Sequence, residues 1–312
     1  MRYSRQEILI GKSNQTKLNK ATAAIIGLGA TGSVTAQILA RAGINLVLVD
    51  RDIVEFSNIQ RQLYKESDVG LPKVNATEEK IKKINSQVKT LTLAIDLNPK
   101  NINQIKADII LDCTDNLQTR FLINDYSLKK NIPWIYCAGI TFSATVMPFI
   151  PDKNRACFRC VFEKSISNET CDTSGVMAPA TFIAASLQSN LAIDILLGKK
   201  PTDMLRFNLS NYELTKIKVK KKDCHACKGI YDYLEGDKFQ YIKELCGKGT
   251  FQFYTNKKLS LLKKNLKKIG EVKSIKGFFQ FRNISVFEDG RVLVVAKNKK
   301  QASSIFSKLI GN

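Results

Sequence analysis

The chain has 312 residues, of which 44% are hydrophobic, and this length and composition predict one large or two modest globular domains. Its formal net charge is +21. Because its eight cysteines occur without an apolar leader segment, we expect reduced thiols in a cytoplasmic protein and no disulfide framework. Two long uncharged stretches, Ile132–Pro151 and Thr173–Ile193, contain proline and hydroxyl residues, so we expect buried elements and no membrane span.

Strands and helices alternate through the N-terminal half. Short apolar runs, which predict strands, lie at Ala23–Ile26, Leu46–Asp50, Val88–Ile95, Ile109–Cys113, Trp134–Ala138 and Ala144–Ile150. Segments that predict helices lie between them, at Ser33–Ala42, Lys73–Ser86 and Gln118–Lys130. This alternation predicts an α/β fold with a doubly wound, mainly parallel, Rossmann-like sheet and helices on both faces.

The pattern becomes less regular after Cys160. A polar loop at Ser165–Gly175 precedes a long buried helix at Ala180–Leu197 and an antiparallel pair of strands at Met204–Leu209 and Glu213–Val219. A weak boundary at Gly229–Asp237 divides the chain into a domain of residues 1–235 and a small basic α+β module of residues 236–312. In this module we expect strands at Phe251–Tyr254, Phe278–Phe281 and Ile284–Val295, helices at Leu259–Ile269 and Gln301–Leu309, and a hairpin turn at Glu288–Arg291.

Two Cys-x-x-Cys pairs, Cys157–Cys160 and Cys224–Cys227, are separated by 63 residues. Four thiolates in two such pairs suit a tetrahedral Zn²⁺ ion, with metal–sulfur bonds of about 2.3 Å. Because four cysteines leave no open coordination position, we expect a structural metal. Four free thiols, with one pair oxidised, are the alternative.

A glycine-rich loop, Gly27-Leu28-Gly29-Ala30-Thr31-Gly32, follows the first strand and opens a helix. Asp50 ends the next strand, 21 residues after Gly29. Glycines let backbone N–H groups approach a phosphate, and an acidic residue in this place binds ribose hydroxyls. Both NAD and ATP fit the loop, and a plain turn between strand and helix is the structural alternative.

The residues after Asp50 distinguish an ATP-binding site from an NAD-binding site. Ser57-Asn58-Ile59-Gln60-Arg61-Gln62 contains an arginine, and Lys73 stands at an expected helix start. Arginine and lysine beside a nucleotide suit the charge of a triphosphate. Asp112-Cys113-Thr114-Asp115-Asn116 follows a strand end, where doubly wound sheets bind ligands, and Asp115 could hold Mg²⁺.

These motifs, in this order, resemble the ThiF/MoeB/HesA-type ubiquitin-activating-enzyme-like adenylyltransferases. The resemblance covers about residues 1–230 and rests on Arg2–Gln6, Gly27–Gly32, Asp50–Asp52, Ser57–Gln62, Pro72-Lys73, Asp112–Asn116, Cys157–Cys160, Gly175–Pro179 and Cys224–Cys227. It implies an enzyme that uses ATP and Mg²⁺ to adenylate the C-terminal Gly-Gly carboxylate of a ubiquitin-like sulfur-carrier protein of the MoaD or ThiS type. The products would be an acyl adenylate and pyrophosphate.

The resemblance also implies the roles of individual residues. The nucleotide-binding set would be Gly27, Gly29, Ala30, Gly32, Asp50, Asp52, Ser57, Asn58, Arg61, Lys73, Asp115 and Asn116. Within it, Asp50 would bind ribose, while Asn58, Arg61 and Lys73 would hold the phosphates. Asp115 would bind Mg²⁺ and Asn116 would contact the nucleotide. The zinc ligands would be Cys157, Cys160, Cys224 and Cys227.

Two further positions extend the comparison. Arg5 resembles an arginine that reaches the neighbouring subunit's site, which implies a homodimer. Cys171 matches a crossover-loop cysteine and could carry a thioester or join a persulfide exchange, although the nearby Glu169 and Asp172 disfavour its thiolate and an inert loop cysteine is the alternative. Ala30 departs from the family, which commonly has glycine there.

Other functional classes stay open. A zinc-containing NAD(P)-dependent oxidoreductase would need a hydride-relay residue, and none is evident. A zinc-knuckle nucleic-acid-binding protein is suggested by the basic C-terminal region, where residues 216–312 hold 23 Lys and Arg against eight Asp and Glu, so RNA contact there is possible. The carrier and its pathway stay open among molybdopterin, thiamine, tRNA thiolation and protein conjugation.

Overall fold

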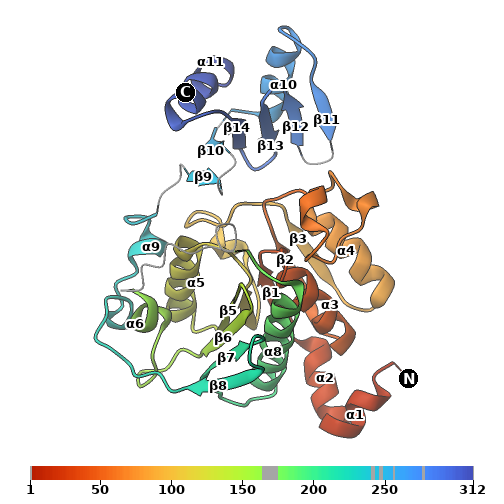
Figure 1. Ribbon diagram of the computed structural model, residues 1–312, viewed down its shortest axis with the longest axis vertical. Coiled ribbons are helices and arrows are strands. Elements are labelled where there is room, and N and C mark those ends of the chain that lie inside the picture. Colours follow the sequence, from red (N-terminus) through yellow and green to blue (C-terminus); the bar gives the residue numbers. More distant parts are fainter. Residues whose placement is uncertain are drawn as a thin grey trace. The chain divides into compact units, whose positions relative to one another are not determined.

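The computed structural model describes residues 2–163, 175–239, 243–245, 249–255, 257–275 and 278–311. The chain divides into two compact units, Met1–Phe239 and Gln240–Asn312. Figure 1 shows the elements of both units. Among the described helices, none is long and apolar enough to cross a bilayer.

An eight-stranded sheet forms the centre of the first unit, in the order β3-β2-β1-β4-β5-β6-β7-β8. Its strands are β1 Thr22–Ile26, β2 Asn45–Val49, β3 Thr90–Leu93, β4 Ile109–Asp112, β5 Trp134–Ile140, β6 Ser143–Phe149, β7 Met204–Asn208 and β8 Glu213–Ile217. Strands β3, β2, β1, β4 and β5 are parallel to one another. Strands β6, β7 and β8 each pair antiparallel with the strand before them. From β1 the chain adds β2 and β3 toward one edge of the sheet, and from β4 it adds strands toward the opposite edge. A topological switch point therefore lies between β1 and β4.

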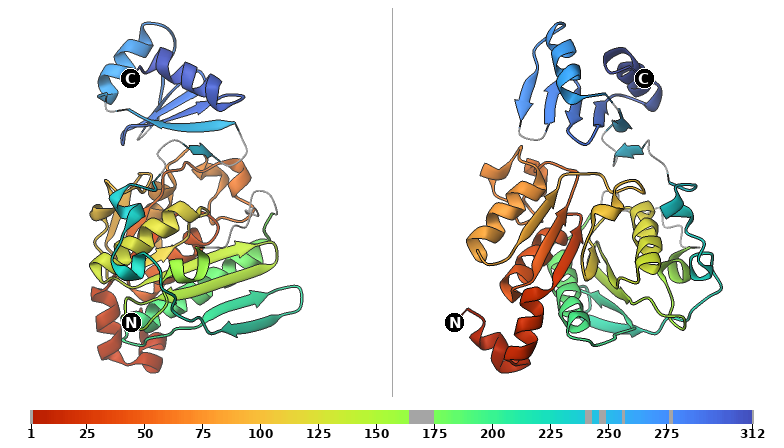
Figure 2. Two further views of the ribbon diagram at one scale, coloured as in Figure 1. Left: turned by 90° about the vertical axis from the view of Figure 1, so that its left-hand side faces the viewer. Right: turned by 180° about the vertical axis from the view of Figure 1, so that it is seen from behind.

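Helices cover both faces of this sheet, as Figure 2 shows. They are α1 Ser4–Ile10, α2 Lys12–Lys20, α3 Gly32–Ala42, α4 Lys73–Ile84, α5 Leu117–Lys130, α6 Phe158–Phe162, α8 Ala178–Leu196 and α9 Asp232–Glu235. The alternation of β5 separates the faces, because Ile135 and Cys137 join the core with α3 and α8. The rings of Trp134 and Tyr136 point to the other face and contact Phe158 of α6. The doubly wound, mainly parallel α/β fold is therefore confirmed, with Trp134 and Cys137 in its core.

The described part of the first unit also contains the short 3₁₀ helices η1 Phe56–Asn58, η2 Glu66–Asp68, η3 Ile102–Gln104 and η4 Ala226–Lys228. The apolar sequence pattern did not predict α1 and α2. Helix α1 has no buried residue, and its Ile8 and Leu9 are 77% and 85% exposed. Most of the surface of these two side chains is therefore uncovered by the described part of the chain.

The second unit is an α+β module with an antiparallel sheet in the order β11-β12-β13-β14-β10-β9. Its elements are β9 Lys243–Leu245, β10 Thr250–Tyr254, α10 Leu259–Lys267, β11 Lys273–Ile275, β12 Phe278–Phe281, β13 Ile284–Phe287, β14 Arg291–Val295 and α11 Lys299–Leu309. Both helices pack on one face, where Phe253 stacks on Phe306 with ring centroids 4.7 Å apart. The single strand expected at 284–295 was wrong, because the turn at Gly290 (φ +84°) splits it into the hairpin β13–β14. Strands β9 and β11 were not expected.

Candidate functional site

The glycine-rich loop lies between β1 and the first turn of α3. Gly27 has φ +88°, and a Cβ there would lie 2.7 Å from the carbonyl oxygen of Cys113. A Cβ on Gly32 would lie 1.9 Å from the carbonyl oxygen of Gly27. The protein's own packing therefore requires both of these glycines.

Gly29 differs from its two neighbours in the loop. A Cβ at Gly29 would have only Gln62 Nε2 near it, at 3.9 Å. The space in front of this backbone is thus open, at the N-terminus of a helix whose first N–H groups favour an anion. A phosphate group fits this cradle, and the partly exposed Ala30 lies beside it.

Asp50 joins the end of β2 to the glycine loop. Its carboxylate accepts the N–H of Leu28 at 2.6 Å and that of Asp52 at 2.7 Å, and the residue is 8% exposed. Burial raises the pKa of Asp50 above its ordinary value, against the opposing attraction of Lys73. The carboxylate therefore has a fixed position next to the loop, where a ribose hydroxyl can reach it.

Lys73 is the first residue of α4 and is 6% exposed. An antiparallel bridge between Ile53 and Pro72 brings it back to β2, and its N–H donates to the carbonyl of Asp52 at 2.9 Å. Its Nζ lies 3.2 Å from Asp52 Oδ2. Burial acts to lower the pKa of Lys73, but Asp52 and Asp50 outweigh it, so the pKa is raised and the ammonium stays charged.

The predicted phosphate-binding segment follows β2. Asn58, in η1, is buried and accepts the N–H of Glu55 at 3.0 Å, while the exposed Ser57 donates its hydroxyl to Glu55. Arg61 is partly exposed and donates from Nη1 to the carbonyl of Ser57 at 3.0 Å. Next to it, the buried Gln62 Oε1 has no hydrogen-bond partner among the described residues. The motif Ser57–Gln62 gives Gln62 no role of its own, and its place beside Gly29 adds it to the candidate site.

A buried ion pair stabilises the loop after β4. Asp112 is fully buried and lies 3.0 Å from Arg120 Nε, and it also accepts the N–H and the hydroxyl of Thr114. Asp115 is exposed and follows the end of β4 by three residues. Asn116 caps α5, since its Oδ1 accepts the N–H of Thr119 at 2.9 Å. Sequence reasoning did not single out Arg120, which carries no motif signal of its own.

Arg5 lies far from this loop. The neighbouring Gln6 donates to the carbonyl of Ala42 at 3.2 Å, at the C-terminal end of α3. The glycine loop is at the other end of this 11-residue helix, which is about 16 Å long at 1.5 Å per residue. Within one chain Arg5 is therefore separate from the nucleotide site. Cys171, with the rest of its loop, lies outside the described residues.

The four predicted zinc ligands come together. The sulfur atoms of Cys157, Cys160, Cys224 and Cys227 lie 3.5–3.7 Å apart in the five pairs with measured contacts. A tetrahedral site with metal–sulfur bonds of about 2.3 Å has edges of about 3.8 Å, whereas a disulfide needs about 2.05 Å. This cluster of four thiols therefore has the dimensions of a closed zinc site, and no disulfide joins its members.

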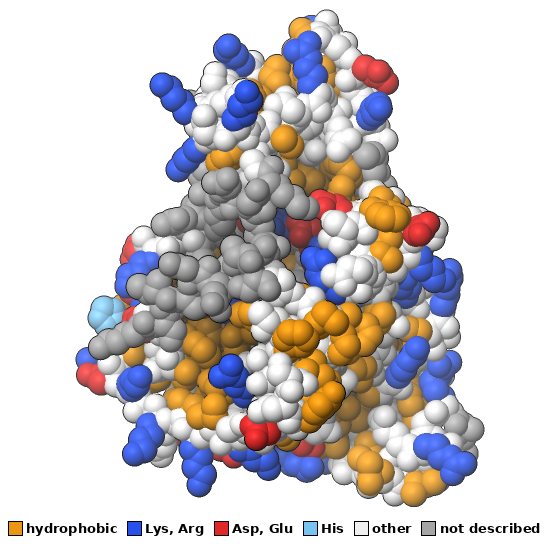
Figure 3. All heavy atoms as spheres, viewed as in Figure 1, with side chains coloured by type: hydrophobic (Ala, Val, Ile, Leu, Met, Phe, Trp, Pro, Cys, Tyr) orange, Lys and Arg blue, Asp and Glu red, His pale blue; other side chains and the backbone are white. Residues whose placement is uncertain are grey.

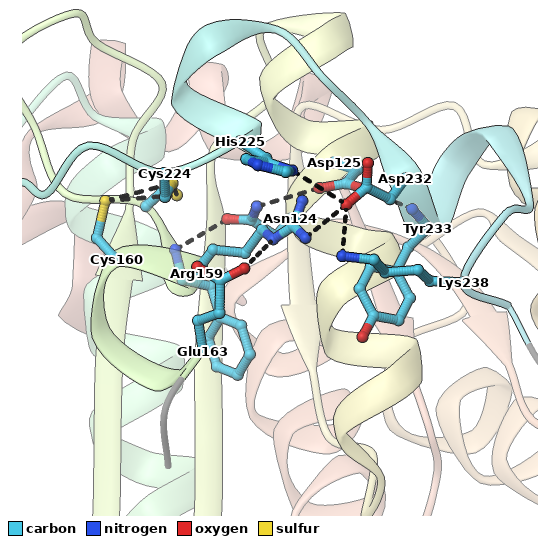
Figure 4. A network of polar contacts seen from close by, with 12 residues as sticks. Asn124, Asp125, Arg159, Cys160, Glu163, Cys224, His225, Asp232, Tyr233 and Lys238 are labelled. Carbon is cyan, nitrogen blue, oxygen red and sulfur yellow. Dashed lines mark hydrogen bonds and ion pairs between the residues drawn. The ribbon is translucent and has the colours of Figure 1, made fainter.

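A network of polar contacts lies beside the cysteine cluster, as Figure 4 shows for Cys160 and Cys224. Arg159, inside the first pair, is 2% exposed and donates from Nη2 to Asp232 Oδ2 at 2.8 Å. Asp232 also lies 2.9 Å from Lys238 Nζ and 3.6 Å from His225 Nδ1. The imidazole of His225 is 59% exposed and is outside the cysteine cluster. Asp125 of α5 accepts the N–H of Tyr233 at 3.0 Å. Helix α9 is therefore bonded to α5 through Tyr233 and to α6 through Asp232.

With this geometry established, comparison with known proteins identifies the family. The sequence profile of the ThiF family matches residues 3–228. The chain belongs to the ThiF family. This confirms the resemblance found in the motifs and the expected Rossmann-like fold.

Two curated relatives of this ThiF-family chain are adenylyltransferases. The sulfur carrier protein ThiS adenylyltransferase of Bacillus subtilis (strain 168) is 36% identical over 340 residues, which cover 99% of both chains. The molybdopterin-synthase adenylyltransferase of Escherichia coli (strain K12) is 32% identical over 238 residues, which cover 73% of this chain and 96% of that protein. The match to the Bacillus protein thus extends over the second unit.

Solved structures show the same fold. The crystal structure of E. coli MccB with ATP superimposes with a TM-score of 0.65 at 23% identity, over 73% of each chain. Neither the oxidoreductase nor the nucleic-acid alternative is favoured by these ThiF-family relatives, and none of them supports RNA contact. The roles of individual site residues stay predictions.

Proposed function

We propose that this protein uses ATP to adenylate the C-terminal Gly-Gly carboxylate of a ubiquitin-like sulfur-carrier protein. The observation that carries the proposal is the end-to-end match with a ThiS adenylyltransferase, at 36% identity and 99% coverage of both chains. On that match we propose a ThiS-type carrier. Because the reaction consumes ATP and the metal site needs reduced thiols, we place it in the cytoplasm.

The chemistry requires no catalytic base. A carboxylate is ionised at neutral pH, so it attacks the α-phosphorus directly. A carboxyl–phosphate bond forms, the α–β anhydride bond breaks, and pyrophosphate leaves. The protein has to position the two reactants and to balance charge on the phosphates, and the charged Lys73 beside the open loop at Gly29 suits this task.

A divalent cation agrees with the charges of the site. Lys73 shares its charge with a carboxylate, since its Nζ lies 3.2 Å from Asp52 Oδ2, so a further cation would help to balance a polyanionic triphosphate. Asp115, which is exposed at the carboxyl end of β4, is the residue that would hold Mg²⁺. Mg²⁺ held there would supply positive charge to balance the negative charge of the phosphates.

A homodimer would bring Arg5 to a nucleotide site. Arg5 is too far from the glycine loop of its own chain, and the exposed Ile8 and Leu9 on α1 form an apolar surface that a second copy can cover. If Arg5 acts across the dimer, Arg5→Ala and Lys73→Ala chains are each inactive alone. Mixing them at equal ratio should restore about a quarter of the unsubstituted activity, because half of the dimers are mixed and each contains one intact site. No recovery on mixing would place Arg5 outside the site.

The carrier needs a surface near the nucleotide. Exposed apolar side chains lie near the carboxyl ends of β5 and β7: Phe142 in the turn after β5, Met177 at the N-cap of α8, Tyr212 in the turn after β7 and Leu214 in β8. Backbone bonds join these turns, since Met177 N donates to Thr141 O and Leu209 N donates to Phe142 O. Figure 3 shows apolar side chains gathered on a face of the first unit. We propose that the body of the carrier docks on the four-residue set, at the same sheet edge as Asp115.

ATP–pyrophosphate exchange tests the function. The purified chain with a ThiS-like carrier that ends in Gly-Gly should catalyse exchange, and the same carrier without its last glycine should give none. Lys73→Ala should lower kcat/KM by about a hundredfold, because one charged phosphate contact is lost. Lys82→Ala, which removes a lysine that is 60% exposed on the same helix, should have no effect. Failure to exchange with any Gly-Gly carrier would contradict the proposal.

A further inference from the structure

Tyr64 lies between the glycine-rich loop and helix α4, and the site described above does not use it. The residue is 6% exposed. Its hydroxyl oxygen lies 2.8 Å from the carbonyl oxygen of Leu28 and 3.1 Å from Oγ1 of Thr77. A carbonyl oxygen only accepts, so the single hydroxyl proton of Tyr64 goes to Leu28, and the hydroxyl of Thr77 donates to Tyr64. Burial raises the pKa of Tyr64 well above its ordinary value, so this proton stays in place.

Leu28 is bonded through both of its backbone polar groups. Its N–H donates to Asp50 Oδ2 at 2.6 Å, and its carbonyl accepts from Tyr64. The peptide bond between Leu28 and Gly29 is trans and planar, so its C=O and its N–H point in opposite directions. In the described part of the chain no group accepts the N–H of Gly29, and the space beside this residue is open. The hydroxyl of Tyr64 therefore fixes the direction of an N–H group that is free to bind a phosphate oxygen.

The same side chain joins the loop to α4. Thr77 is 2% exposed and comes four residues after Lys73, so the two side chains lie on one face of the helix. Lys80, three residues further along, places its Nζ 4.5 Å from the centre of the Tyr64 ring. Contacts with α4 thus hold Tyr64, and its hydroxyl holds the loop. This arrangement fixes the N–H of Gly29 relative to the helix that carries Lys73.

We infer that Tyr64 is a positioning residue for the phosphates of ATP, because its hydroxyl holds the peptide of Leu28 and Gly29 so that the Gly29 N–H faces a phosphate oxygen. This inference rests on the proposed function and adds to it a residue that touches no substrate atom. Since the hydroxyl acts through one peptide of the loop, its loss should affect ligands that carry phosphate and should spare a nucleoside.

The test removes one oxygen atom from each of two buried tyrosines. Tyr64→Phe keeps the ring beside Lys80 and removes the hydroxyl. Tyr126→Phe is the matched control, because Tyr126 is 3% exposed and its hydroxyl also donates to a backbone carbonyl, that of Ile105, at 2.9 Å. Each variant loses one buried hydrogen bond, so both thermal midpoints should fall by a similar amount, about 2–4 °C.

Ligand affinities distinguish the two variants. Binding of Mg-ATP is measured by calorimetry on the full zinc-loaded chain, with inorganic tripolyphosphate and adenosine as competitors. Tyr64→Phe should weaken the binding of ATP and of tripolyphosphate by about tenfold each, because a charge-assisted hydrogen bond to phosphate loses its alignment, and should leave adenosine binding unchanged. Tyr126→Phe should bind all three ligands as the unsubstituted chain does.

A third variant tests the contact with α4. Thr77→Val removes the donor to Tyr64 and keeps the volume of the side chain, so it should weaken ATP binding less than Tyr64→Phe does. The double variant should bind ATP as Tyr64→Phe does, because Thr77 acts through the hydroxyl that is already missing. If Tyr64→Phe does not fold, as judged by its thermal midpoint, Thr77→Val decides the outcome, and unchanged ATP affinity in that variant would overturn the inference.

The outcomes separate this inference from the proposed function. Equal ATP affinity in Tyr64→Phe and the unsubstituted chain would overturn the inference alone, and so would an equal loss of affinity in Tyr126→Phe. A loss of adenosine binding as large as the loss of ATP binding would also overturn it, because the whole site would then have changed. An unsubstituted chain that does not bind ATP would contradict the proposed function and this inference together.

Discussion

Arg159 and Asp232 form an ion pair of 2.8 Å between residues that are 73 positions apart in the sequence. Arg159 lies inside the first cysteine pair, and Asp232 follows the second pair at the start of α9. Their side chains are 1% and 13% exposed. The arginine and the aspartate thus join the same two chain segments that the four cysteines join.

Asp232→Asn should destabilise the protein, because it leaves the buried Arg159 guanidinium without its closest anionic partner. The hydrogen bond with Arg159 lowers the pKa of Asp232 to about 2, so the carboxylate is charged at neutral pH. We expect a loss of about 1–3 kcal/mol in the free energy of unfolding, measured by urea titration at pH 7. Asp223→Asn is the matched control, since Asp223 pairs with Lys228 at 2.8 Å but is 78% exposed, and its change should stay under about 0.5 kcal/mol. Equal effects of the two substitutions would contradict this account.

Removal of the metal should destabilise the two segments that the four cysteines join and leave the glycine-rich loop unchanged. The isolated chain should contain one zinc ion, and Cys160→Ala should contain almost none. Because the site is closed by four cysteines, its metal contributes to folding, and we expect the thermal midpoint to fall by about 5 °C or more. Cys137→Ala, which changes a buried thiol of β5 outside the cluster, should keep its zinc. Full zinc content in Cys160→Ala would rule out this ligand set.

Substitution by alanine should lower the stability of the protein at Gly32 and its affinity for ATP at Gly29. Gly32→Ala puts a methyl group 1.9 Å from the carbonyl oxygen of Gly27, so it should cost about 3 kcal/mol or more in stability. Gly29→Ala meets nothing closer than 3.9 Å and should leave the unfolding free energy within about 0.5 kcal/mol. It should nevertheless weaken ATP binding by about tenfold, because the methyl group occupies the space that a phosphate would fill. Unchanged ATP affinity in Gly29→Ala would remove this loop from the phosphate site.

Asp125 should make stability depend on pH in mildly acidic solution. Burial raises the pKa of Asp125 to about 6, so the folded state holds this proton more tightly than the unfolded chain, where the pKa is about 4. The free energy of unfolding therefore decreases as pH rises from about 4 to about 6, by up to about 3 kcal/mol from this group, and is level above that range. Asp125→Asn should make the slope over this interval less negative, as measured by urea titrations at several pH values. The exposed Asp237→Asn should keep the original slope.

Most strands of the first unit could be predicted because each is a short run of apolar residues that both faces of the sheet bury. The expected strands at Ala23–Ile26 and Ile109–Cys113 differ from β1 and β4 by one residue at one end. Helix α1 was missed because Ile8 and Leu9 are exposed, so its pattern does not show a buried face. The hairpin in the second unit was recognised by its turn residues, but the strand pairing across it required the structure.

The candidate site was predictable only in part. Its motif residues carry local signals, such as the glycines at 27, 29 and 32, but the residues that support them do not. Gln188 is one example, since it lies in a long apolar helix and is fully buried. Its side-chain amide donates to the carbonyls of Asp112 and Ile135 at 2.9 and 3.1 Å, which joins α8 to β4 and β5 beneath the site. A single glutamine among apolar residues gives no indication of such a role.

The amino-acid sequence by itself determined the family, the two cysteine pairs and the glycine-rich loop. These features depend on residues only a few positions apart, where chain geometry leaves few choices: two cysteines three positions apart can face one metal, and a glycine can take a positive φ. Only the tertiary structure decided which distant groups meet, as Arg51 meets Asp96 and Arg159 meets Asp232. Those pairs depend on the order of the strands and on how the helices pack on the sheet, and both are set by burial of the whole core.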